Sequence, residues 1–320
     1  MKLLEIKTPQ ITLSLDLQAL DAILQNMDND VIITVQQIDP STLSAAARAA
    51  IGDRPVYMLT VTSGGKKITN FDGGWISVAL PYIPADGENP SGLCAVYIDG
   101  EGGAEWLWNS GYSRAAGALL FSTEHFSIFG IGYREPPEFA DIGTHWAKED
   151  IEYAAVRSLF SGTADNMFSP DLAMSRAMLV TVLWRMEGSP ALNRASDFSD
   201  VAGSMYYAEA VAWAASNGIV SGYGSGLFGP DDSITREQIA AILHRYAQYK
   251  RYDASAGADT NILSYTDAFD ISEYAIPAVQ WACGAGLLQG SNGNLMPLEN
   301  ATRAQVAAIL HRFSPGRGLL

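Results

Sequence analysis

The order of hydrophobic and polar residues divides the chain into two parts with different periodicities. Up to about residue 134, β-branched and aromatic runs of strand length alternate with Gly-containing turn signals, a pattern typical of antiparallel sheets. The runs are Val31–Val35, Val56–Thr62, Trp75–Leu80, Ala95–Ile98, Ala118–Phe121 and Phe126–Phe129. Two helical segments, 17–24 and 41–51, interrupt them. We therefore expect a β-sandwich-like domain over residues 1–134.

Internal repetition dominates the rest of the chain, which begins after a stiff, polar Pro linker at 135–138. An aromatic residue followed two positions later by Asp recurs at intervals of 59 and 67 residues, and a Pro recurs at intervals of 60 and 67. The three aromatic–Asp pairs start at Phe139, Phe198 and Tyr265, and the prolines are Pro170, Pro230 and Pro297. These landmarks place three repeats at 139–190, 198–250 and 265–314.

Each repeat has the hydrophobic period of two helices separated by a Gly-rich loop. The first helix carries apolar residues at i, i+4 and i+8, and the second has an apolar stripe at the same offsets in every repeat. The first-helix positions are Ile151/Ala155/Leu159, Val211/Ala215/Ile219 and Val279/Cys283/Leu287. Such short helix pairs must share one core. The chain is thus predicted to be a multidomain α+β protein whose second part is an all-α bundle of helix-loop-helix repeats.

The start of each second helix holds the residues best suited to bind a ligand. Thr235 and Gln238, and likewise Thr302 and Gln305, form capping boxes, whereas Ser175 lacks the returning Gln. Arginine follows the cap in all three repeats, although the helix dipole disfavours a positive charge there by about 0.3–1 kcal/mol. Either an external anion or a salt bridge to the Asp of a neighbouring repeat would offset that cost. We predict an anion site made by the helix N-termini with Arg176, Arg236 and Arg303.

These motifs resemble S-layer homology domains over residues 139–314. The resemblance implies a pseudo-three-fold bundle whose grooves bind secondary cell-wall polysaccharide, often carrying pyruvate ketals, and it implies that Arg176, Arg236 and Arg303 contact this ligand. It also implies an extracellular location, at the cell wall or S-layer. The chain departs from the family's Thr-Arg-Ala-Glu motif at its last position, where the three repeats have Met178, Gln238 and Gln305.

Aromatic residues at the first helices admit two interpretations. Trp146, Tyr206 and Tyr274 either stack on sugar rings at the grooves or belong to the core, and the sequence leaves both open. Tyr153, Trp213 and Trp281 lie on the helices themselves, where core packing is favoured. The Asp residues of the three aromatic–Asp pairs are expected to cap or turn the chain at the first helix, not to bind ligand.

Composition and charge exclude several kinds of partner. The net charge of −15 and pI of about 4.6 argue against nucleic acid and anionic lipid. We predict no membrane partner, because no stretch has the length of a membrane helix, and the first residues lack the apolar core of a signal peptide. The four histidines are scattered, so we expect no metal site and no cofactor. The oligomeric state is not predicted.

Two other functions compete with wall binding. The tripeptide His125-Phe126-Ser127 resembles the cleavage site of self-cleaving ZU5-type β-sandwich domains, which implies cleavage between Phe126 and Ser127. No other catalytic residues are predicted, because paired acids mean little in a chain with 35 of them. The third possibility is a helical-repeat scaffold that binds another protein through an open concave surface.

Overall fold

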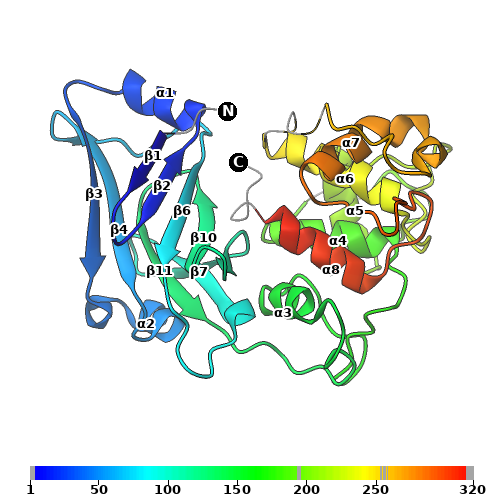
Figure 1. Cartoon of the computed structure of the whole chain (residues 1–320), viewed down its shortest axis with the longest axis horizontal. Coiled ribbons are helices and arrows are strands. Elements are labelled where there is room, and N and C mark those ends of the chain that lie inside the picture. The colour runs from blue at the N-terminus through cyan, green and yellow to red at the C-terminus, as the bar shows by residue number, and fades with distance from the viewer. Residues whose placement is uncertain (1–3, 193–195, 253, 255–256, 258, 315–320) are drawn as a thin grey trace. The chain divides into compact units, whose positions relative to one another are not determined.

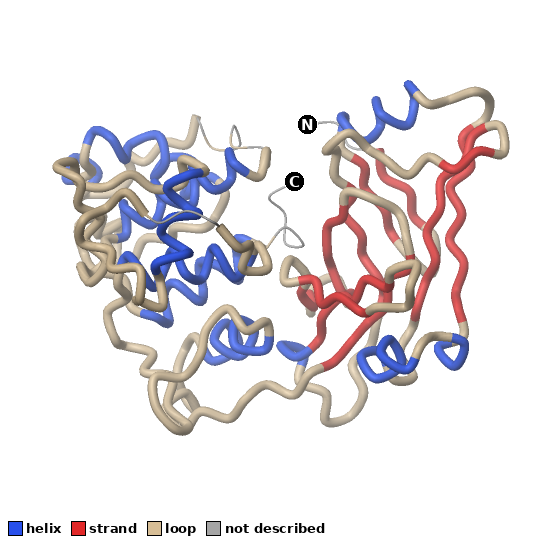
Figure 2. The backbone as a smooth tube through the Cα atoms, turned by 180° about the vertical axis from the view of Figure 1, so that it is seen from behind, coloured by secondary structure: helices blue, strands red, loops and turns tan. Residues whose placement is uncertain are grey.

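The computed structural model describes residues 4–192, 196–252, 254, 257 and 259–314. Its backbone divides after Pro136 into two compact units, with the strands in the amino-terminal unit and most of the helices in the carboxy-terminal one (Figure 2). Within the described ranges no helix has the length and apolar character needed to cross a membrane.

The amino-terminal unit consists of two antiparallel sheets, which confirms the predicted β-sandwich-like region (Figure 1). The first sheet has the order β1 (Leu4–Lys7), β2 (Thr12–Leu15), β6 (Ile76–Pro81), β10 (Ala118–Thr123), β9 (Gly111–Ser113). The second has the order β3 (Val31–Ile38), β4 (Val56–Ser63), β11 (Ile128–Tyr133), β7 (Leu93–Ile98), β8 (Ala104–Leu107), and β5 (Lys66–Lys67) pairs with β4. Alternate residues of β4 and β6 are buried, as expected for strands that cover a core on one face.

One apolar core joins the inner faces of both sheets, with Leu13, Val78 and Phe121 from the first and Leu59 and Phe129 from the second. Helix α1 (Leu17–Gln25) adds buried residues to this core and begins at Asp16, whose carboxylate accepts from the amide of Ala19. Helix α2 (Ala45–Ile51) packs in a smaller cluster with Val56, Val96 and Ile98. Short 3₁₀ turns, η1 (Pro40–Thr42) and η2 (Pro90–Gly92), precede α2 and β7.

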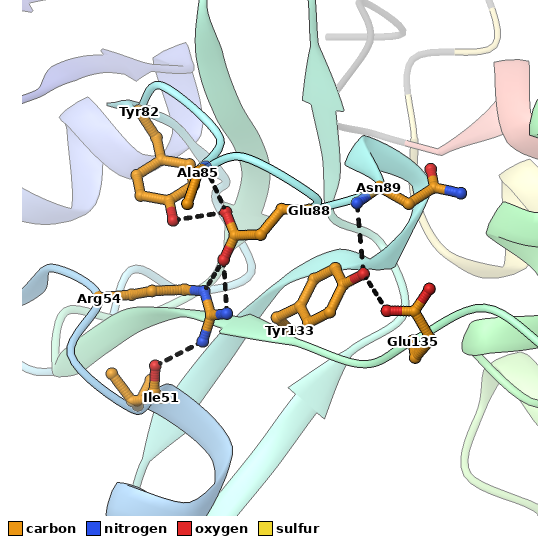
Figure 3. Close-up of polar contacts among 8 residues, drawn as sticks. All are labelled: Ile51, Arg54, Tyr82, Ala85, Glu88, Asn89, Tyr133 and Glu135. Atoms are coloured by element: carbon orange, nitrogen blue, oxygen red, sulfur yellow. Dashed lines mark hydrogen bonds and ion pairs between the residues drawn. The ribbon is translucent and has the colours of Figure 1, made fainter.

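A partly buried ion pair fixes the loop between β6 and β7 (Figure 3). Arg54 donates from Nε and Nη2 to one oxygen of Glu88, at 2.8 and 2.5 Å. The other oxygen of Glu88 accepts from the hydroxyl of Tyr82 and the amide of Ala85, both at 2.8 Å. Arg54 also donates from Nη1 to the carbonyl oxygen of Ile51. The carboxylate and the guanidinium therefore satisfy each other inside the unit.

The carboxy-terminal unit is a cyclic arrangement of three helix pairs. The first helix of each repeat packs on the second helix of the preceding one: α5 on α4, α7 on α6 and, closing the ring, α3 on α8. The bounds are α3 (Lys148–Val156), α4 (Arg176–Met186), α5 (Ala208–Ser216), α6 (Arg236–Tyr249), α7 (Ile276–Gly284) and α8 (Arg303–Phe313), with 3₁₀ turns η3 (Ala268–Asp270) and η4 (Glu273–Ala275) before α7. At the closure His311 stacks on Tyr153, with ring centroids 3.9 Å apart, and bonds to Asp150 at 2.6 Å.

The prediction of an all-α bundle is wrong, because extended segments join the repeats. Met174 donates to the carbonyl of Ala301, Ala301 to that of Ile234, and Ile234 to that of Met174, at 2.8–2.9 Å. This closed ring is flanked by β-bridges between repeats, and each Gly-rich loop contains a further bridge. The residues just before the second helices show no helical period, so hydrophobic spacing could not reveal that they pair as β-structure.

Candidate functional site

The three arginines at the helix starts connect successive repeats through backbone carbonyls. Each guanidinium donates from Nε to the carbonyl two residues before the loop Pro of the next repeat. It also donates from Nη2 to the carbonyl of the residue that precedes the loop Gly of that repeat. Arg176 donates to Phe228 and Ser221, Arg236 to Leu295 and Gln289, and Arg303 to Phe168 and Ser161. The three side chains are only 5–7% exposed, so they belong to the contacts between repeats as well as to any binding surface.

The expectation of free amides at the helix N-termini is wrong. The amide of Arg176 donates to the carbonyl of Asp232, and the amide of Ala177 donates to that of Pro230. Ser175 caps the third amide through its hydroxyl. The same pattern recurs at α6 and α8, where both predicted capping boxes are present. The first-turn amides therefore hold the repeats together, and only side chains remain to bind an anion.

The loop residue whose carbonyl accepts from the arginine Nε also donates its amide to the Asp of an aromatic–Asp pair. Asp200 accepts from the amides of Phe228 and Gly229, while Arg176 of the preceding repeat donates to the carbonyl of Phe228. Asp141 and Asp267 repeat this geometry. Partial burial alone would raise the pKa of Asp200, but the two amide hydrogen bonds and the nearby Arg176 outweigh it and lower that pKa. The Asp residues are thus engaged in the loops, not in direct salt bridges to arginine.

The buried arginines keep a positive charge that is not neutralised by contact with an acid. Within the described part of the chain none of the three forms an ion pair with a carboxylate; Arg176 instead lies over the rings of Tyr223 and Phe228, 4.5 and 4.9 Å from their centroids. Burial lowers the pKa of all three guanidiniums from the usual value, yet arginine stays protonated at neutral pH. A concave surface beside them is therefore suited to an anion.

Such a surface exists beside Arg176, where a cavity of about 330 Å³ receives residues from all three repeats. We call this cavity the Arg176 groove. Its polar lining is formed by Arg176, Ser221, Tyr223, Gln238, Arg245 and Tyr274, and the described lining contains no carboxylate. The volume lies at the lower end of the range of small-molecule sites, roughly 300–1,000 Å³. Two guanidiniums can bind a carboxylate, and two phenol rings can pack against an apolar face of a ligand.

The exposed aromatic residues occupy equivalent places in the ring of repeats. Trp146, Tyr206 and Tyr274 are 62%, 61% and 56% exposed. Tyr274 lines the Arg176 groove, while the phenol of Tyr206 is under the electrostatic influence of Arg185 and Arg303. The second set, Tyr153, Trp213 and Trp281, is buried, which confirms its predicted place in the core. Exposure leaves the first set able to stack on a ligand.

Sequence reasoning missed the second arginine of the groove. Arg245 lies nine residues after Arg236, and the other repeats have Arg185 and Arg312 at the same spacing from Arg176 and Arg303. This repeated spacing was available as a signal. At the same time, the spacing alone could not show which of these side chains faces a cavity, since each lies near a buried apolar stripe.

The segment that resembles a self-cleaving site lies just before β11. His125 packs against the rings of Tyr97 and Phe129, with centroids 4.9 and 5.8 Å away. The carbonyl of Ser127 accepts from the amide of Leu59 in ordinary strand pairing. Among the described residues no group of three or more His, Cys, Asp or Glu side chains could hold a metal ion.

Comparison with known proteins identifies the repeats. The sequence matches the S-layer homology domain at residues 138–177, 197–240 and 264–307. It is 32% identical over 223 residues to an amylopullulanase of Thermoanaerobacterium thermosulfurigenes, covering 68% of this chain and 12% of that protein. It is 29% identical over 288 residues to the exoglucanase XynX of Acetivibrio thermocellus, covering 89% of this chain and 25% of that protein.

A further relative is the cellulosome-anchoring protein of Acetivibrio thermocellus, 27% identical over 177 residues that cover 51% of this chain and 37% of that protein. This chain thus spans a quarter or less of the length of the two enzymes named above. The three matches to this domain fall at the spacing of the three helix pairs. The chain contains three S-layer homology domains in tandem, at residues 138–177, 197–240 and 264–307.

Proposed function

We propose that the three domains hold this protein at the bacterial cell wall, without a covalent bond, by binding secondary cell-wall polysaccharide that carries acidic groups such as pyruvate ketals. The single observation that carries the proposal is the Arg176 groove, where two guanidiniums line a cavity without a described carboxylate. This local charge contrasts with the net charge of −15 of the whole chain. A charge-assisted contact to an acid group can operate at short range despite an unfavourable overall field.

We propose two roles for the arginines at the helix starts, one structural and one in ligand binding. Arg176, Arg236 and Arg303 lock neighbouring repeats through Nε and Nη2, while their remaining charge attracts the ligand. Trp146, Tyr206 and Tyr274 would supply aromatic faces for sugar rings, a use that their exposure permits. On this proposal the chain binds and does not catalyse, and it works outside the cell. Several relatives are named as surface or anchoring proteins, which supports that location.

Co-sedimentation with purified Gram-positive sacculi tests the proposal. We expect the wild-type chain to pellet with untreated walls and to stay in solution with walls stripped chemically of their non-peptidoglycan polymers. Arg176→Gln should pellet far less, and because Arg176 also joins two repeats, its pelleting is compared at a temperature at which thermal unfolding shows the variant to be folded. Arg114→Gln, in the amino-terminal unit, serves as the control for a lost positive charge. Equal pelleting with stripped and untreated walls would refute binding to the polysaccharide.

A further inference from the structure

The second arginines of the three repeats, Arg185, Arg245 and Arg312, differ in their hydrogen bonds. Arg185 donates from Nη1 to the carbonyl of Leu159 at 3.0 Å, and Arg312 donates from Nη1 to the carbonyl of Leu287 at 3.3 Å. Arg245, the equivalent residue of the second repeat, makes no hydrogen bond or ion pair within the described part of the chain, and its side chain lines the Arg176 groove instead. Among the described residues, the second guanidinium is therefore free of protein acceptors only in this repeat, whereas Arg185 and Arg312 each commit one of their five N–H donors to a carbonyl.

Arg176 is also less tightly held than its two equivalents. Its Nη2 lies 3.4 Å from the carbonyl oxygen of Ser221, whereas the matching distances are 2.9 Å for Arg236 and 2.7 Å for Arg303. The long bond is the weaker one, so an incoming oxygen competes with it most easily. Burial is the main cause that lowers the pKa of Arg176, and the neighbouring positive charge of Arg245 also lowers it. An anion bound between the two guanidiniums would relieve this repulsion.

The wall of the Arg176 groove formed by the third repeat is fixed by a buried acid. Glu237 accepts from the hydroxyl of Tyr274 at 3.1 Å and from the hydroxyl and amide of Ser272 at 2.8 and 2.9 Å. The first and third repeats have Ala177 and Ala304 at the position of Glu237. Tyr274 is consequently anchored at its hydroxyl end while its ring remains at the groove, which reduces the entropy lost when a ligand stacks on it.

We propose that Arg245 is a ligand-binding residue and that the Arg176 groove is the principal binding site of the three. This inference rests on the proposed function and adds to it the residue pair that selects the ligand. The chemical class is a saccharide bearing a carboxylate, which Arg176 and Arg245 bind together while the ring of Tyr274 lies against the sugar. The equivalent pairs, Arg236 with Arg312 and Arg303 with Arg185, contribute less, because the second arginine of each is held by a carbonyl.

The test measures binding of an N-acetylhexosamine methyl glycoside that carries one pyruvate ketal, with the unsubstituted glycoside as the neutral probe. Isothermal titration of the full chain is compared for wild type, Arg245→Gln and Arg245→Lys, with Arg185→Gln and Arg312→Gln as matched controls. We expect Arg245→Gln to weaken binding of the acidic glycoside by about tenfold to a hundredfold, the usual contribution of a charge-assisted hydrogen bond. Arg245→Lys should recover part of the loss, and binding of the neutral glycoside should not change.

The outcomes separate this inference from the proposed function. If the wild type binds the acidic glycoside and Arg245→Gln binds it equally well, Arg245 is not a ligand residue, although wall binding stands. If Arg185→Gln or Arg312→Gln weakens binding as much as Arg245→Gln, the Arg176 groove is not the principal site. If the wild type binds neither the acidic glycoside nor untreated walls, the proposed function itself fails. Thermal unfolding of every variant shows whether a loss of binding reflects a loss of folding.

Discussion

Arg54 in the amino-terminal unit and Arg176 in the repeats are both arginines removed largely from water, but their partners differ in charge. Arg54 meets the carboxylate of Glu88 in a two-point contact, which neutralises it (Figure 3). Arg176 meets carbonyl oxygens and aromatic rings, which satisfy its donors without cancelling its charge. The first arrangement fixes a loop, whereas the second fixes a contact between repeats and still leaves a positive potential at a cavity.

The difference teaches how one side chain can be both structural and available for binding. A buried pair of opposite charges has little residual attraction for a third ion. A guanidinium held by neutral acceptors keeps its field, and the low dielectric around it makes that field stronger than in water. The acidic composition of the chain makes such places rare, so the Arg176 groove stands out among the described cavities by its lining.

Removing Arg303 should have the largest effect, because it closes the ring between the third and first repeats. Arg303→Ala deletes the hydrogen bonds to Phe168 and Ser161 and leaves two part-buried carbonyls without a donor. We expect the repeats to lose about 4 kcal/mol of unfolding free energy. Hydrogen exchange measured by mass spectrometry on the full chain should show faster exchange in α3 and α8, with unchanged exchange in the β-sandwich. A loss below about 1 kcal/mol would contradict the interlocking role.

Breaking the ion pair of the other unit should have the next largest effect. Glu88→Ala leaves Arg54 without its counter-charge and removes the acceptor of Tyr82 and Ala85. We expect a loss of about 3 kcal/mol, confined to the amino-terminal unit. The double variant Arg54→Met/Glu88→Leu should recover most of this loss, because no unpaired charge remains. Equal destabilisation by the single and double variants would show that the hydrogen bonds, not the charges, hold the loop.

Adding a carboxylate to the Arg176 groove should neutralise Arg176 in part, as Glu88 neutralises Arg54. Gln238 lines the groove and also closes the capping box of Thr235. Glu at this position keeps the cap and suits the helix dipole, which should stabilise α6 by about 0.5 kcal/mol. The same charge should weaken binding of an acidic glycoside by about fivefold. We expect Gln238→Glu to raise the melting temperature and to lower the affinity measured by titration calorimetry. Gln305→Glu, in the third repeat, is the matched control and should leave the affinity nearly unchanged.

Local hydrophobic and polar patterns predicted much of the fold. The runs at 31–35 and 56–62 became β3 and β4, because β-branched residues alternate there between a buried and a more exposed face. The helix at 17–24 matched α1 almost residue for residue. By contrast β1 and β2 escaped notice, since each has only four residues and Pro9 lies between them. The run 126–129 was placed too early, and β11 begins at Ile128.

The candidate site was only partly predictable because its partners are backbone atoms. Repetition pointed to Arg176 and its equivalents, and it was right that an unusual interaction offsets their unfavourable position. Which interaction does so depends on carbonyls more than fifty residues away, such as those of Phe228 and Ser221. Every residue has a backbone carbonyl, so the residue type does not show which carbonyl accepts a hydrogen bond from an arginine. The binding role of the arginines and of the exposed aromatics therefore stays a prediction, which the variants above test.

The smallest effect at neutral pH, and the sharpest at low pH, should come from the loop carboxylates. Hydrogen bonds to backbone amides outweigh partial burial and lower the pKa of Asp141, Asp200 and Asp267 in the folded state. A lowered folded pKa means stability that is present above the unfolded value of about 3.9 and is lost as pH falls through the folded pKa. We expect the melting temperature of the repeats to fall steeply below about pH 4. Asp200→Asn should melt lower than the wild type at pH 7, and the difference should shrink as the pH falls below about 3.9; a difference that stays constant as the pH falls would show that the charge of Asp200 does not carry the effect.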